Sequence, residues 1–146
     1  MGEFSINVTR PFGPPIGFTK ISNDLIEKIN NFIDETASTD YANELNYGNK
    51  LAGQVTQEIK LPSNIINDGL ISFFGVLTKG YIKSVLNKEI SKFELLSTWI
   101  VRQFENEYNP PHLHNGHISG LGYLKLPTSF GNTIQHTKKK EHTWRN

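Results

Sequence analysis

Residues 109–124 read Asn-Pro-Pro-His-Leu-His-Asn-Gly-His-Ile-Ser-Gly-Leu-Gly-Tyr-Leu and contain three of the chain's five histidines. The two prolines stiffen the approach to His112 and remove two backbone donors, while Asn115-Gly116 is a strong turn dipeptide. Segments rich in β-forming residues lie on both sides, at Phe93–Phe104 and Ile118–Leu126. The stretch therefore predicts two strands with a histidine-bearing turn between them.

His112 and His114 have the spacing at which two side chains of an extended strand point to the same face. Their attachment points then lie about 6.6–6.8 Å apart, a span across which two imidazoles can converge on one metal ion. A single histidine is more often exposed or hydrogen-bonded in the core, so the pair carries the prediction of metal binding. His117 has an odd spacing from both and is expected on the opposite face.

The composition limits the class of protein. A chain of 146 residues fits a single domain, 1–146, that can bury roughly 68–70% of its unfolded surface. Its sixteen aromatic residues (nine Phe, five Tyr and two Trp) argue against a disordered chain. Because there is no cysteine, a metal site would have to use histidine, carboxylate or water ligands.

Charge and hydropathy indicate a cytoplasmic protein without a nucleic-acid or membrane partner. The net charge of +1 gives no general attraction for polyanions. The basic run Lys138–Lys140 belongs to 130–146, which we expect to be a flexible tail. No uninterrupted apolar run approaches the ~18–20 residues that span a bilayer, and the first residues lack the pattern of a secretory signal.

Two helices are predicted ahead of the histidines. Ser22 or Asn23 can cap the first, whose apolar residues recur at helical spacing. These residues are Leu25, Ile26, Ile29, Phe32 and Ile33. From Ser63 a second apolar pattern keeps a period of about 3.6 residues for about five turns. Three glycines interrupt it, each costing roughly 1 kcal/mol relative to alanine, so a long helix with a kink is expected.

The remaining segments carry weaker signals. Residues 4–10 alternate loosely and lead into 11–17, whose prolines and glycines suit an extended lead-in or an edge strand. The polar stretch Thr36–Lys50 contains turn formers and is expected to be an exposed loop. Val55–Ile59 is a candidate short strand.

Three further side chains are candidates for the site. Arg102, in the strand before the histidines, can bind an anion through its guanidinium, with a surface arginine as the alternative. Tyr123, in the strand after them, can offer its hydroxyl to a carboxylate, with a core aromatic as the alternative. His136 and His142 follow a Gly-Asn turn in a lysine-rich region; exposed histidines are the default there, but either could complete a three-ligand site.

The segments Tyr108-Asn-Pro-Pro-His-Leu-His114 and Ile118-Ser-Gly-Leu-Gly-Tyr-Leu-Lys-Leu-Pro127 resemble the 2-oxoglutarate/Fe(II)-dependent oxygenases related to prolyl 4-hydroxylases, a group that includes proteins carried by bacteriophages. Specific similarity covers 98–127. The resemblance implies an α+β fold, with N-terminal helices packed on a partial double-stranded β-helix, a jelly-roll or cupin-like sheet. It also implies Fe(II) and 2-oxoglutarate as cofactors, with ascorbate as a reductant and the host cytoplasm as the location if a phage encodes the chain.

In that family a His-X-Asp or His-X-Glu motif and a distal histidine hold the iron. Here His112 matches the first ligand, His114 occupies the carboxylate position, and His136 is the candidate distal ligand. Tyr123 would correspond to the tyrosine that contacts 2-oxoglutarate, with Arg102 as a second contact. Few residues follow His114, so the domain is expected to be truncated and incomplete, with a homo-oligomer covering its exposed sheet edges.

Three functions are compatible with these residues. The leading hypothesis is an oxygenase of prolyl-hydroxylase type that hydroxylates a C–H bond of a peptide or protein substrate, with succinate and CO2 as co-products. The alternative is a truncated, inactive relative that acts as a metal-binding or protein-interaction module. A zinc hydrolase is a weaker third hypothesis, because no Glu or Asp lies at a recognisable general-base spacing from the histidines.

Overall fold

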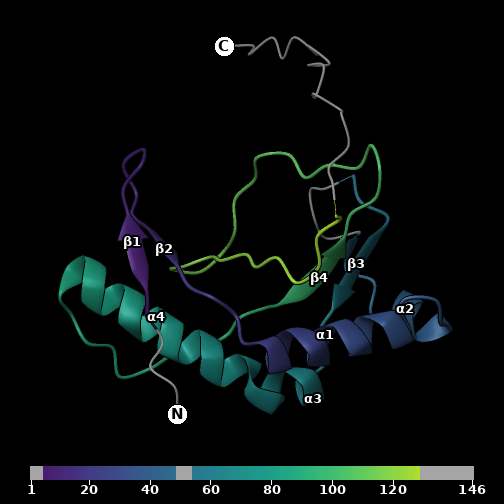
Figure 1. The fold of residues 1–146 in the computed structure, drawn as a ribbon, viewed down its shortest axis with the longest axis horizontal. Coiled ribbons are helices and arrows are strands. Elements are labelled where there is room, and N and C mark those ends of the chain that lie inside the picture. Colours follow the sequence, from purple (N-terminus) through teal and green to yellow (C-terminus); the bar gives the residue numbers. More distant parts are fainter. Residues whose placement is uncertain (1–4, 49–53, 129–146) are drawn as a thin grey trace, which may run out of the picture.

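The computed structural model describes residues 5–48 and 54–128. Helices and short antiparallel strands make up this part of the chain, so the fold is α+β, as the sequence predicts (Figure 1). The elements are β1 Asn7–Thr9, β2 Ile16–Phe18, α1 Asn23–Thr36, α2 Asp40–Glu44, β3 Gln57–Lys60, α3 Ser63–Ile65, η2 Ile66–Leu70, α4 Ile71–Leu86 and β4 Trp99–Arg102. The predicted tail at 130–146, with His136 and His142, lies outside the described residues.

The strands form two separate antiparallel pairs. β1 pairs with β2, and β3 pairs with β4, with Gln57 opposite Arg102 and Lys60 opposite Trp99. Residues 45–47 lie along the other edge of β3, where the Tyr47 amide donates to the Glu58 carbonyl at 2.7 Å. Within the described residues these pairs do not form a jelly-roll or cupin sheet.

The predicted strands around the histidines are largely wrong. Only Trp99–Arg102 of Phe93–Phe104 is a strand, and Ile118–Leu126 contains none. Side chains of α1 hold the latter segment instead of a neighbouring strand. The Asn30 side-chain amide donates to the Leu124 carbonyl, and Lys125 pairs with Asp34, each at 3.2 Å.

The first predicted helix is confirmed as α1, and Ser22 occupies its N-cap position. Leu25, Ile29 and Ile33 are buried because a spacing of four residues places them on one helical face. The expectation of an exposed loop after this helix is wrong in part. The polar stretch contains α2, whose Ala42 is buried in the core.

The second predicted helix is also confirmed, with its kink. α3, η2 and α4 follow one another from Ser63 to Leu86, and the backbone leaves helical geometry at Asp68 and Gly69. Gly69 has a φ of 99°, a conformation that L side chains disfavour. The kink thus occurs at a glycine, and Leu70 and Phe73 just beyond it are buried.

Within the described residues, Ser63–Leu86 is long and apolar enough to cross a membrane by length and composition alone. Its most apolar 18-residue window has a mean hydropathy of 1.2. The kink leaves α4 with 16 residues. At about 1.5 Å per residue, a helix of that length spans about 24 Å, less than the ~30 Å of a bilayer core. The expected lack of a membrane partner stays a prediction.

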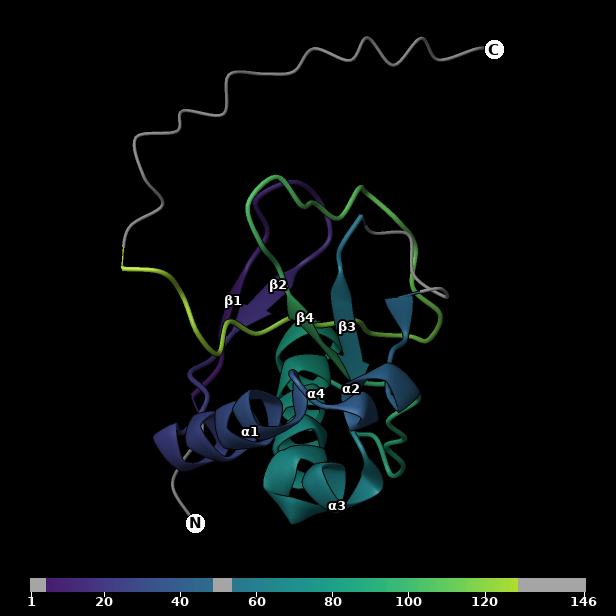
Figure 2. The ribbon, with the colours of Figure 1, turned by 90° about the vertical axis from the view of Figure 1, so that its right-hand side faces the viewer.

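The helices form a layer under the β3–β4 pair, with the β1–β2 pair beside it (Figure 2). Ile59 of β3 and Leu61 just after it are 2% and 1% exposed and pack in the core with α1. Since strand side chains alternate, Gln57 and Ile59 point to the helices, whereas Glu58 and Lys60 point to the other face. We call this second face the outer face; Trp99 and Val101 of β4 share it through the register.

Candidate metal site

The three histidines of the described residues lie in the segment that follows β4. Just before it, the Tyr108 carbonyl accepts from the Gln54 amide at 2.9 Å. The Glu107 carboxylate accepts from the backbone amides of Thr56 and Phe104, both at 2.8 Å, and also from the Thr56 hydroxyl. These bonds fix the start of the segment to the chain that enters β3.

His112 and His114 lie together. Their ring centroids are 4.5 Å apart with an interplanar angle of 68°, and the His114 ring lies 5.6 Å from the ring of Trp99. The predicted strand is absent, so alternation along a ladder does not produce this proximity. The outer-face tryptophan of β4 supports His114 instead, and His114 in turn contacts His112.

The carbonyl of Pro110 indicates which ring nitrogen of His112 carries the proton. Its Nδ1 lies 2.7 Å from the Pro110 carbonyl oxygen. A carbonyl oxygen only accepts hydrogen bonds, so Nδ1 carries the proton and donates it. The lone pair of a neutral ring is then on Nε2, where it is available to a metal ion. A backbone carbonyl fixes metal-binding histidines in the same way.

A carboxylate that the sequence analysis missed lies on the outer face, which also carries Trp99. Glu58 is 2% exposed, and its Oε2 is buried without a hydrogen-bond partner. Burial raises the pKa of Glu58 above its usual value, and the electrostatic interaction with His112 lowers it by a smaller amount. The charged residue in an otherwise strand-like Val55–Ile59 was the available signal, but its burial on the outer face depends on folding.

The described residues supply a pair of ligands rather than a complete site. No group of three His, Asp or Glu side chains in 5–48 and 54–128 is placed to hold a metal ion together. Two adjacent imidazoles are nevertheless donors that an iron site can use. The predicted third ligand, His136, lies outside the described residues, and His117 is exposed.

The two predicted contacts for 2-oxoglutarate differ in placement. Arg102 alternates to the helix side of β4 and donates to the Gln57 side-chain carbonyl at 2.6 Å. Its guanidinium also lies 5.5 Å from the ring of Phe104. Tyr123 is 71% exposed. Arg102 therefore lies on the face opposite the one that carries Trp99, on which His114 packs.

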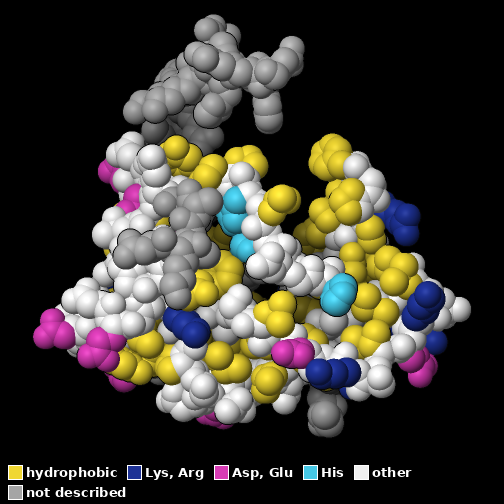
Figure 3. Space-filling view, turned by 180° about the vertical axis from the view of Figure 1, so that it is seen from behind, with side chains coloured by type: hydrophobic (Ala, Val, Ile, Leu, Met, Phe, Trp, Pro, Cys, Tyr) yellow, Lys and Arg dark blue, Asp and Glu magenta, His cyan; other side chains and the backbone are white. Residues whose placement is uncertain are grey.

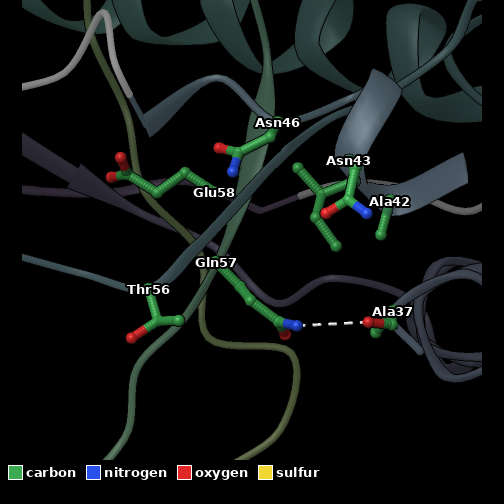
Figure 4. A pocket seen from close by; sticks show the side chains of 8 residues that line it. Ala37, Ala42, Asn43, Asn46, Thr56, Gln57 and Glu58 are labelled. Carbon is green, nitrogen blue, oxygen red and sulfur yellow. Dashed lines mark hydrogen bonds between the residues drawn. The ribbon is translucent and has the colours of Figure 1, made fainter. Parts of the chain in front are cut away.

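A polar pocket of about 140 Å³ lies between β3 and α2. Its lining residues are Ala37, Ala42, Asn43, Asn46, Thr56, Gln57, Glu58 and Ile59. Figure 4 shows that the side chains of Gln57 and Glu58 leave the strand in opposite directions. The Gln57 side-chain amide donates to the Ala37 carbonyl at 3.1 Å, so the pocket wall on the α1 side is held in place.

The face that bears the histidines is hollowed and rich in hydrophobic side chains (Figure 3). Leu113, between the two paired histidines, is 99% exposed, and Leu121 is 82% exposed. A large exposed apolar surface often marks a binding site.

Comparison of the chain with protein-family models, curated proteins and solved structures gave no match.

Proposed function

We propose that this chain binds Fe(II) through His112 and His114 and is an oxygenase of the 2-oxoglutarate-dependent, prolyl-hydroxylase type. One observation carries the metal-binding part of the proposal. The two rings lie 4.5 Å apart, and His112 already donates its Nδ1 proton to a backbone carbonyl. This leaves Nε2 of His112 as a metal donor beside a second imidazole.

The oxygenase part rests on the motif similarity at 98–127. Iron and 2-oxoglutarate, when bound, would supply the oxygen chemistry that converts a substrate C–H bond into C–OH, with succinate and CO2 as co-products. This chain's own histidines, His112 and His114, would hold the metal. The β3–β4 pair, with 45–47 at its edge, would then be the described part of a double-stranded β-helix sheet.

The described residues support the binding of 2-oxoglutarate less than they support the binding of iron. Arg102 is on the helix side of β4 and already binds Gln57. We therefore assign it no contact with the co-substrate in this proposal. Tyr123 stays the candidate, because its exposed hydroxyl is free to meet a carboxylate from solution.

Metal titration with a control histidine tests the proposal. Anaerobic calorimetric titration of Fe(II) should give a binding isotherm for the wild type that His112→Ala and His114→Ala abolish. His117→Ala removes an exposed imidazole three residues from His114 and should leave the isotherm unchanged. An isotherm that is absent in the wild type, or equally weakened in all three variants, contradicts the proposal.

Activity separates the oxygenase from the second candidate. That candidate is a non-catalytic metal-binding or interaction module, and the inward pairing of Arg102 together with the two small sheets of the described residues favours it. With Fe(II), ascorbate and 2-oxoglutarate supplied, the oxygenase should release succinate above the level of His112→Ala. Metal binding without such succinate would support the module.

A further inference from the structure

One edge of β4 has no partner strand within residues 5–48 and 54–128. β4 pairs with β3 on one side (Figure 1), and the two isolated bridges, at Asn46 and Gln54, involve other segments. The far edge of β3, by contrast, is covered by 45–47. An unpaired strand edge offers backbone donors and acceptors with which another chain can pair. We call this side of β4 the free edge.

The hydrogen bonds of β4 show which backbone groups lie on the free edge. The Thr98 carbonyl accepts from the Leu61 amide at 3.2 Å, so the backbone of Thr98 points toward the chain that follows β3. In an antiparallel pair, the N–H and C=O groups of successive residues point alternately to the two sides. Ile100 therefore bonds with β3, whereas Trp99 and Val101 direct their N–H and C=O groups to the free edge.

The free edge lacks the features by which soluble proteins prevent strand pairing. Residues 99–101 contain no charged residue and no proline, and the register of β4 with β3 is continuous, without a bulge. The charged group of Arg102 is bound on the helix side, where it donates to Gln57 at 2.6 Å. Val101 is 36% exposed, so solvent reaches this part of the strand. Such an edge is expected to be covered by another strand.

We propose that the free edge pairs antiparallel with the free edge of a second copy of this chain, with Ile100 on the two-fold axis. Trp99 then lies opposite the partner's Val101, and Val101 opposite the partner's Trp99. Each of these pairs exchanges two backbone hydrogen bonds, so all the donors and acceptors of both free edges are used. An aromatic residue opposite a β-branched one is also a favourable cross-strand pair.

The charges of β4 favour a second copy in this register. Arg102 is the charged residue of the strand, and it would lie opposite the partner's Thr98. The two arginines would then be separated by about four residues, or roughly 13 Å along the strands, so like charges are not opposed. The free edge is thus complementary to itself, as a two-fold interface requires. This pairing does not depend on a metal ion, and it gives the expected homo-oligomer a defined interface.

Sedimentation velocity of the full chain over a range of concentrations tests the proposal. The wild type should sediment as a dimer. Val101→Lys should sediment as a monomer at concentrations where the wild type is a dimer, because it places two like charges beside the axis. Val76→Lys, on α4, is the matched control: it makes the same change at a valine that is 41% exposed, and it should remain a dimer.

A single introduced cysteine gives an independent measurement, because the chain contains none. Ile100 would face the partner's Ile100 in a pair without hydrogen bonds, where the Cα atoms are about 4.5 Å apart, within the range of a disulfide. Oxidation of Ile100→Cys should therefore give a covalent dimer. Val76→Cys, oxidised under the same conditions, should not.

Two results would overturn the proposal. One is a wild type that is monomeric at every concentration, which would mean that something other than a second copy covers the free edge. The other is a folded Val101→Lys that dimerises as strongly as the wild type. Circular dichroism checks folding; if Val101→Lys is unfolded, oxidation of Ile100→Cys decides, and the lack of a covalent dimer refutes the interface.

Discussion

Gly17 of β2 lies against the ring of Tyr81 on α4, and this contact fixes the β1–β2 pair on the helix. A Cβ at position 17 would meet the Tyr81 ring at 2.8 Å. The ring is held in place because its hydroxyl donates to the Pro15 carbonyl at 2.8 Å. We expect Gly17→Ala to lower the free energy of unfolding by about 1–3 kcal/mol, as overpacking does.

Urea denaturation measures this change, and Gly120→Ala is its control. A Cβ at position 120 would meet nothing within 4 Å among the described residues. Gly120→Ala should therefore leave the unfolding midpoint close to that of the wild type. Equal midpoints for both variants would show that the Gly17 contact does not constrain the chain.

Residues of the candidate site could be predicted from the sequence only where they are neighbours in one segment of the chain. The spacing of His112 and His114 identified the pair, and the structure brings their rings to 4.5 Å. Glu58 was missed because its burial on the outer face depends on the pairing of β3 with β4 across the fold. Arg102 was placed in the correct strand, but its face follows from pairing with Gln57, which the sequence did not show.

Among the elements, the kinked helix gives a prediction with an internal control. Gly69 has a φ of 99°, so Gly69→Ala forces a side chain into a left-handed conformation. We expect a loss of about 1–2 kcal/mol in the free energy of unfolding. Gly75 lies within α4, where a Cβ would be 3.5 Å from Phe93, an ordinary contact.

Gly75→Ala should therefore be neutral or stabilising by up to about 1 kcal/mol, because alanine is the better helix former. The midpoints of thermal and chemical unfolding should fall for Gly69→Ala and should stay equal or rise for Gly75→Ala. A loss for Gly75→Ala as large as that for Gly69→Ala would contradict a kink fixed by backbone geometry.

The connection between β4 and the histidines depends on Glu107. Hydrogen bonds from Thr56 and Phe104 hold the pKa of this carboxyl below its usual value. A lowered pKa in the folded chain contributes stability above the unfolded pKa, and that contribution is lost as the pH falls through the folded pKa. We expect Glu107→Gln to increase amide hydrogen exchange at 104–108 near neutral pH, because neutral glutamine accepts more weakly.

The same exchange experiment at falling pH gives the check. The wild type should approach the behaviour of Glu107→Gln once the carboxyl is protonated, after correction for the intrinsic exchange rate. Glu105→Gln, at an exposed neighbour, should exchange as the wild type does at every pH. Exchange at 104–108 that is identical in the wild type and Glu107→Gln near neutral pH would show that Glu107 does not hold the connection.

Helices were predicted better than strands for a physical reason. The apolar periods of α1 and of Ser63–Leu86 are local, so the sequence alone contains them. A strand needs a partner, and Ile118–Leu126 has β-forming residues but is joined to α1 at Leu124 and Lys125 instead of to a strand. The short α2 was missed because one buried residue, Ala42, gives too weak a period to recognise.

At the scale of the whole molecule, the candidate site joins parts that are far apart in the sequence. Glu58 belongs to β3, Trp99 to β4, and the histidines to the segment after β4. All of these parts lie on the outer-face side of the β3–β4 pair, and the helices pack against the opposite face of this pair. A metal ion held by the histidine pair, whose His114 packs on Trp99 of β4, would therefore link the exposed histidine segment to the folded core.

This link predicts that metal stabilises the entire fold. A ligand that binds only the native state adds about 2.7 kcal/mol to the free energy of unfolding when its free concentration is 100 times its Kd. We expect Co(II) to raise the thermal midpoint of the wild type and a chelator to reverse the rise. His117→Ala should respond as the wild type does, whereas His112→Ala should not respond. A rise of the same size in His112→Ala would mean that the ion binds elsewhere, and the histidine pair would lose its assigned role.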